Sequence, residues 1–185
     1  SDAMRALVRS WNAVMGRADA TLADALVSST SAATQLAALA ARGAEGIPGT
    51  YLVPRLAQYR AEVETIVPGA ADALGARDFG RFGSIVDQSQ RLAEEALGNQ
   101  VAETIALQRM ARERGAVAAS AFGAGFGGAV WAMVARDDAA AFAASWREAY
   151  VAAFPQHAGY AKVVLTEPAG PARESHDGAD APDAG

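Results

Sequence analysis

The feature that most constrains the fold of this chain is a glycine-rich loop between two apolar runs, within residues 118–135 (AASAFGAGFGGAVWAMVA). Four of the six residues from position 123 to position 128 are glycine. Each glycine costs about 0.5–1 kcal/mol relative to alanine on folding, because its backbone loses more freedom. Glycine also lets backbone N–H groups approach a neighbour or an anion without a Cβ in the way. The pattern therefore predicts a short strand, a loop and a second, buried strand.

Two common nucleotide-binding motifs do not explain this loop. The spacing of Gly123, Gly125 and Gly128 matches the dinucleotide fingerprint GxGxxG, but that motif requires a helix after the loop. Here the loop is followed by residues 129–135 (AVWAMVA), which are typical of a buried strand, and no acidic residue ends a strand about twenty positions on. A phosphate loop of the form GxxxxGKS/T is excluded because Lys162 is the only lysine.

The stretch instead resembles the third conserved motif of the GHMP kinases, and within that family it is most similar to the galactokinases. Those proteins carry a strand, a loop of the form TGAGFGG and a second strand. Phe122 replaces the threonine before the loop, and Ser120 replaces an arginine two positions earlier. The loop itself matches residue for residue, and its members are Gly123, Ala124, Gly125, Phe126, Gly127 and Gly128.

A second, weaker similarity lies upstream of the loop. Galactokinases carry an NESH-like stretch on a helix, and Asp87-Gln88-Ser89-Gln90 resembles a divergent copy in which only Ser89 is identical. Asn99-Gln100-Val101 stands where galactokinases usually read CPELD. The resemblance extends from about Trp11 to Thr166 and indicates a galactokinase-related branch rather than a typical galactokinase.

Apolar residues recur at intervals of three and four along most of the chain, which predicts amphipathic helices. Pro68 is expected to end one of these helices, since proline cannot donate a backbone hydrogen bond. Residues 160–166 (YAKVVLT) alternate and end in β-branched residues, which predicts a strand. Helices are expected at 4–15, 22–26, 34–41, 52–67, 70–74, 79–97, 101–114 and 138–154.

This order of elements predicts an α+β domain in which antiparallel strands are backed by several helices. The resemblance implies the ferredoxin-like sheet of a GHMP kinase C-terminal domain. We expect that domain to cover residues 1–167, with a helical lead-in at 4–50. Residues 168–185 are small, polar and acidic, so we expect them to form a disordered tail.

The composition excludes several classes of protein. A net charge of −5 gives no excess of positive charge to attract nucleic acid or an anionic membrane. The absence of cysteine excludes disulfides, thiolate metal sites and a cysteine nucleophile. Apolar stretches are interrupted well short of the roughly 20 residues that span a bilayer. Ser1-Asp2-Ala3-Met4 does not begin a secretory signal, so we expect a cytoplasmic protein and either a cloning remnant before Met4 or a chain cut from a longer one.

The glycine loop has two interpretations. It is either a tight hairpin whose glycines only permit the turn, or, as the resemblance implies, a backbone wall beside nucleotide phosphates. Ser120 and Phe122 share a strand face because they are two positions apart. They either pack in the hairpin or border a sugar, with Phe122 stacking on the ring and Ser120 bonding a hydroxyl.

Two residues on the upstream helix complete the possible substrate cleft. Ser89 interrupts an apolar stripe, and its hydroxyl requires a partner. That partner is either the cleft or a carbonyl one turn back, unless Ser89 merely caps or packs a helix contact. Asp87 falls on a different helix face from Val86, so we expect it to face water.

The missing motifs shape the functional prediction. His157 and His176 are the only histidines, and neither has a spacing that supports a metal site or a catalytic triad. No GLSSS-like phosphate loop is present. The resemblance therefore implies the C-terminal half of a kinase that passes the γ-phosphate of ATP to a sugar hydroxyl, the anomeric one. ATP and Mg²⁺ would be held mainly by a separate N-terminal half, and this half would be inactive alone. The alternative is a stand-alone, non-catalytic ferredoxin-like module that binds or senses a ligand.

Overall fold

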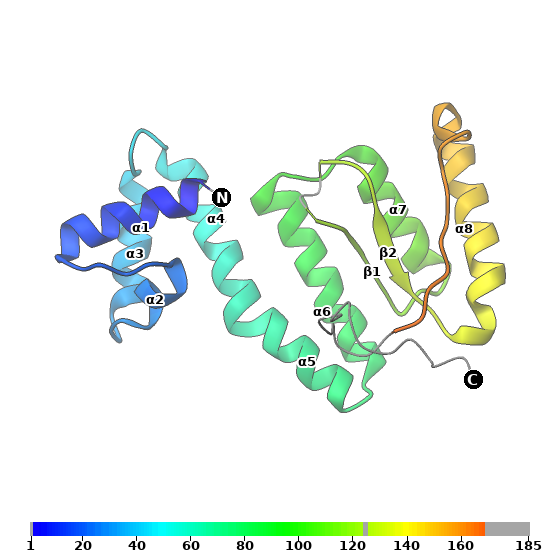
Figure 1. Cartoon of the computed structure of the whole chain (residues 1–185), viewed down its shortest axis with the longest axis horizontal. Helices are drawn as coiled ribbons and strands as arrows, with labels where there is room; N and C mark the ends of the chain where they lie inside the picture. Colours follow the sequence, from blue (N-terminus) through cyan, green and yellow to red (C-terminus); the bar gives the residue numbers. More distant parts are fainter. Residues whose placement is uncertain (1, 124–125, 169–185) are drawn as a thin grey trace, which may run out of the picture.

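The computed structural model describes residues 2–123 and 126–168, and its elements form two groups joined by a long helical rod (Figure 1). The first group contains α1, α2, α3 and the beginning of α4, and the second contains a sheet with helices on both faces. The elements are α1 (Asp2–Met15), α2 (Leu22–Val27), α3 (Ala32–Arg42), α4 (Gly49–Ala61), η1 (Glu62–Ile66), α5 (Val67–Gly75), α6 (Phe79–Leu92), η2 (Ala93–Leu97), α7 (Ala102–Glu113), β1 (Ala118–Ala121), β2 (Val130–Met133), η3 (Arg136–Asp138), α8 (Ala139–Ala153) and η4 (Pro155–His157).

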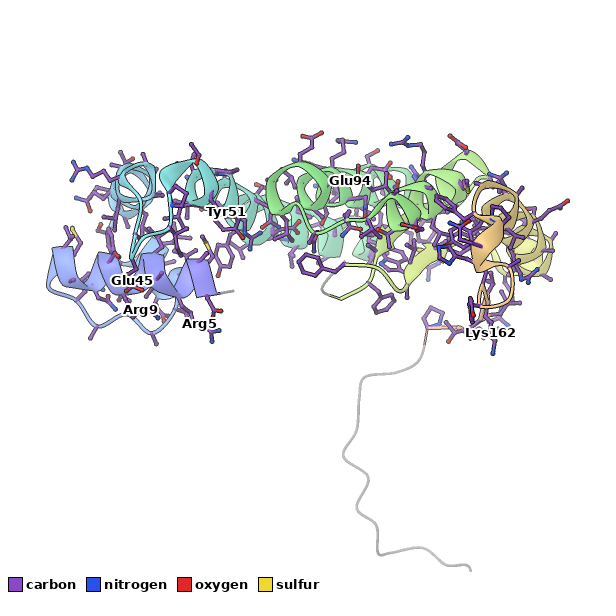
Figure 2. The ribbon with its side chains drawn as sticks, turned by 90° about the horizontal axis from the view of Figure 1, so that it is seen from above. Arg5, Arg9, Glu45, Tyr51, Glu94 and Lys162 are labelled. Carbon is purple, nitrogen blue, oxygen red and sulfur yellow. The ribbon has the colours of Figure 1, made fainter. Side chains whose placement is uncertain are left out.

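The N-terminal group is held by the apolar stripes of its four helices. Leu7, Leu36 and Leu52, from three different helices, are completely buried in one cluster. Figure 2 shows Arg9 and Glu45 beside each other on this group, and their ion pair has an Nη2–Oε2 distance of 2.6 Å. Both side chains are exposed, so this pair contributes little to stability. The apolar periodicity of the sequence therefore accounts for this part of the fold.

The rod that joins the two groups runs from α4 through η1 into α5 (Figure 1). The prediction that Pro68 ends a helix is wrong, because the helix continues through it to Gly75. Directly before Pro68, η1 is a π-helix, in which Val67 N bonds to the Glu62 carbonyl five residues earlier. Proline in an α-helix crowds the carbonyl four residues before it and leaves that carbonyl without a donor. The wider π turn changes this bonding pattern and lets the rod remain continuous.

The sheet of the second group lies between two helical layers. It pairs β1 with β2 in antiparallel register, with Ala118 opposite Met133 and Ser120 opposite Trp131. Ala118, Trp131 and Met133 pack on the side of α5 and α6, whereas Ala119, Val130 and Ala132 pack on the side of α7 and α8. This alternation follows the two-residue period of a strand. It confirms the predicted strand, loop and strand, and the α+β class.

The strand expected at 160–166 is absent from the described part of the chain. Residues 161–168 have no regular structure, although Val163 packs against the cluster between the sheet, α7 and α8. The Arg147 guanidinium on α8 donates to the carbonyls of Ala158 and Ala161, at 3.1 and 3.0 Å. These bonds tie the start of the segment to α8 rather than to a sheet edge. Of the predicted tail, only Pro168 falls within the described residues.

None of the helices in the described ranges is long and apolar enough to cross a membrane.

Candidate functional site

The glycine loop lies at the tip of the β1–β2 hairpin. Gly123, Gly127 and Gly128 have φ values of 65°, 117° and 102°, a region that strongly favours glycine. A Cβ added at any of these three positions would meet nothing within 4 Å. These three glycines are therefore required by the backbone conformation and not by a close neighbour among the described residues. Ala124 and Gly125 lie outside the described residues.

Two exposed aromatic side chains flank the described ends of the loop. Phe122 is 61% exposed and Phe126 is 77% exposed. The Phe122 N–H donates to the Ala129 carbonyl at 2.8 Å, which closes the hairpin directly before the loop. Both rings are largely exposed within the described part of the chain, and the predicted place of Phe122 on a cleft wall stays a prediction.

Ser120 bonds to helix α6 through a buried glutamine. The Gln90 side chain is 2% exposed, and its Oε1 accepts from Ser120 Oγ and from Ala121 N, both at 3.0 Å. Its Nε2 donates to Glu94 Oε1, also at 3.0 Å. This role of Gln90 was not predicted from the sequence. The sequence feature that could have indicated it is a polar residue on the apolar stripe of a helix, four positions after the buried Val86.

Ser89 takes a partner that the sequence analysis did not anticipate. Its Oγ donates to Glu62 Oε1 at 2.6 Å, so the hydroxyl bonds neither a carbonyl one turn back nor a cleft within the described residues. Glu62 begins the π-helix η1, and the bond therefore links α6 to the rod. This position supports the packing interpretation of Ser89 over a role in binding substrate.

The prediction that Asp87 faces water is wrong. Asp87 is half-buried, and its Oδ2 lies 2.9 Å from Arg112 Nη2 on α7. Gln108 Nε2 donates to Asp87 Oδ1 at 3.1 Å. Arg112 Nη1 also donates to the carbonyls of Ala116 and Val117, just before β1. The polar contacts of Asp87 and Arg112 therefore connect α6, α7 and the residues just before β1.

An open hollow of about 320 Å³ lies between α6–η2 and α7. Of the predicted cleft residues, Asp87 lies on its wall, whereas Ser89, Ser120 and Phe122 do not. Figure 2 shows Glu94, on this wall, and Lys162, the only lysine, on opposite sides of the molecule. The described residues contain no group of three His, Cys, Asp or Glu side chains that could hold a metal ion. The wall is formed by Asp87, Gln90, Arg91, Glu94, Gln108, Arg109, Arg112 and Glu113.

Comparison with known families identifies the second group. The model of the GHMP kinase C-terminal region matches residues 70–152, a range that contains α6, α7, both strands and the glycine loop. This part of the chain is a GHMP kinase C-terminal domain, as the glycine loop predicted.

One solved structure with a similar fold is a galactokinase from Lactococcus lactis in complex with galactose. The TM-score is 0.62 and the sequence identity is 22%, over 82% of this chain and 37% of that chain. The chain thus has a galactokinase-like fold and spans just over a third of that galactokinase's length. A comparison with curated protein sequences found no significant match.

Proposed function

We propose that this chain is the C-terminal half of an ATP-dependent kinase that transfers the γ-phosphate of ATP to a hydroxyl of a sugar. The glycine loop would lie against the nucleotide phosphates and form part of the cleft wall. The observation that carries this proposal is that Gly123, Gly127 and Gly128 have positive φ, and a Cβ on any of them would meet no described atom within 4 Å, at the tip of a hairpin within the matched range. The bound galactose of the similar solved structure supports a sugar as the acceptor.

Phosphoryl transfer requires a bound metal ion, for which the described residues show no cluster of three His, Cys, Asp or Glu side chains. Catalysis depends on holding the nucleotide in place and on neutralising charge on the transferred phosphoryl group, usually with Mg²⁺ and a lysine or arginine. The described residues do not fit a magnesium site, and Lys162 lies on the segment after α8. In this proposal, an N-terminal kinase half therefore binds ATP and Mg²⁺ and supplies the transfer residues in the cytoplasm.

The proposal that this half requires an N-terminal half for activity can be tested by comparing two proteins. One is residues 1–185, and the other is the product of the complete reading frame that encodes them. ATP-dependent phosphorylation of a sugar panel, followed by ADP release, should occur only when an N-terminal half with a GLSSS-like loop is present. Phosphorylation by residues 1–185 alone would overturn the proposal. A reading frame that begins at Met4 would instead favour the stand-alone binding module.

The role of the loop is tested by a matched pair of glycine variants in the complete kinase. Gly127→Ala adds a Cβ on the loop, and Gly115→Ala adds one before β1, at the opposite end of the strand. Both glycines have positive φ, 117° and 90°, and neither Cβ would meet an atom within 4 Å, so the backbone penalty is similar. We expect Gly127→Ala to raise KM for ATP about tenfold, roughly the effect of 1.4 kcal/mol, and Gly115→Ala to leave it unchanged. Equal KM values in the two variants would contradict a phosphate contact.

A further inference from the structure

The buried amide of Gln90 is unusual for its position on α6. Phe82, Val86 and Gln90 are spaced four residues apart, so they lie on one face of the helix, and all three are buried. The first two pack in the apolar cluster under the sheet. An apolar residue would continue this stripe, and burying an amide instead costs free energy unless its hydrogen bonds are satisfied. Gln90 therefore has a role that leucine or methionine would not fill.

The hydrogen bonds of Gln90 are concentrated on the last two residues of β1. Its Oε1 accepts from Ser120 Oγ and from the Ala121 N–H, and β1 ends at Ala121. Next to them, the Phe122 N–H bonds to the Ala129 carbonyl of the returning chain, and Gly123 then enters the loop with φ of 65°. The base of the loop is thus fixed by α6 through Gln90 and by the returning chain through Phe122.

Glu94 determines which way the Gln90 amide points. Its Oε1 accepts from Gln90 Nε2 at 3.0 Å, which leaves the amide oxygen for the strand. If the amide turned over, its N–H groups would face the Ala121 N–H donor and its oxygen would face the Glu94 carboxylate. Both contacts are repulsive, so the carboxylate keeps the acceptor on β1.

We propose that Gln90 is a positioning residue that sets where β1 ends and the glycine loop begins, with Glu94 fixing its orientation. This role rests on the proposed function, because it matters to the reaction only if the loop contacts the nucleotide phosphates. Gln90 acts through the strand and the loop, and it touches no reacting atom itself.

The positioning claim is tested first in residues 1–185, without any activity assay. Amide hydrogen exchange of Ala121, measured by NMR, should become about tenfold faster in Gln90→Met, which keeps the length of the side chain and removes the acceptor. Gln90→Glu alone should also lose protection, because it places two carboxylates together. The double variant Gln90→Glu/Glu94→Gln should restore protection, because the new carboxylate accepts from the strand and from the amide introduced at position 94.

Asp78→Ala is the matched control for this experiment. Asp78 caps the other end of α6, where its Oδ1 accepts from Arg81 N at 3.0 Å, and its loss weakens the helix without touching β1. Exchange of Ala121 should then change only as much as exchange across the rest of the strand. Wild-type protection of Ala121 in Gln90→Met, or failure of the double variant to restore it, would overturn the proposal.

The same variants in the complete kinase connect position to function. Gln90→Met should lower kcat/KM for ATP about tenfold, with KM for the sugar unchanged, and the double variant should recover most of the loss. Asp78→Ala should leave both constants unchanged. Faster Ala121 exchange with normal ATP kinetics would keep Gln90 as the anchor of the strand and overturn the proposed phosphate contact of the loop. The exchange and kinetic experiments can therefore fail separately.

Discussion

The backbone of α6 comes close to the residue just before β1 at Gly83, and this contact gives a specific prediction. A Cβ added at Gly83 would lie 2.1 Å from the Val117 carbonyl oxygen and 3.3 Å from Arg112 Nη2. A carbonyl oxygen of the backbone cannot rotate away as a side chain can. Gly83→Ala therefore requires α6 and β1 to separate by about 1 Å before the contact becomes ordinary, because well-packed interiors leave no spare room.

The expected change in the free energy of unfolding for Gly83→Ala follows from two opposing effects. Alanine in a helix is favoured over glycine by about 1 kcal/mol. Forcing extra atoms into a packed contact costs about 1–3 kcal/mol, and a clash with rigid backbone falls at the upper end of that range. We therefore expect Gly83→Ala to lower the free energy of unfolding by about 2 kcal/mol.

Gly80→Ala provides the matched control, three residues earlier on the same helix. Its Cβ would approach only Asp78 Oδ1, at an ordinary contact distance of 3.7 Å, so it should stabilise the chain by up to about 1 kcal/mol. Urea unfolding of both variants, followed by circular dichroism, measures the difference, which should be about 3 kcal/mol. Equal midpoints and slopes for the two variants would refute the close approach of α6 and β1.

Two further predictions concern charged groups. Arg112→Met should destabilise the chain by about 1–3 kcal/mol in urea unfolding, since it leaves the half-buried Asp87 without its ion-pair partner, whereas Arg9→Met on the exposed pair should have a much smaller effect. The Arg17 guanidinium hydrogen-bonded to Asp19 holds the pKa of that carboxyl below its usual 3.8. A lowered pKa stabilises the fold above pH 3.8 and loses this effect as the pH falls further. Between pH 6 and pH 2, wild type should therefore lose more stability than Asp19→Asn, and parallel curves would contradict this.

Local sequence signals predicted much of the helical structure and the hairpin. Asp78 begins α6 as expected, with its side chain accepting from Arg81 N, and Gly98 ends η2 with a left-handed φ of 63°. Each signal acts within a few residues of itself, so it can be recognised without knowledge of the fold. The glycine loop also carried enough information to identify the family.

The errors at Asp87 and Ser89 involve partners far away in the sequence. Asp87 faces α7 because Arg112 lies 25 positions later, and Ser89 bonds Glu62, 27 positions earlier. Helical periodicity separates the buried from the exposed face but does not say which polar side chain meets another. Gln90 shows the same limit, since its burial was visible as an interruption of the stripe while its bonds to β1 required the packed structure.

The π turn before Pro68 has a consequence for how insertions and deletions act on this chain. A π turn holds one more residue than the α-helical turn it replaces. The rod therefore contains one residue more than a continuous α-helix that spans the same distance. Removing a single residue within 62–66 would restore an α-helical turn and keep α5 in phase, whereas removing one from the α-helical part of the rod before it would rotate everything beyond by about 100° about the rod, given 3.6 residues per turn. The buried side of α5 would then face away from α6, although every contact of the N-terminal helices survived. This short turn thus lets the rod lose one residue without a change in the angular phase between the two halves of the molecule.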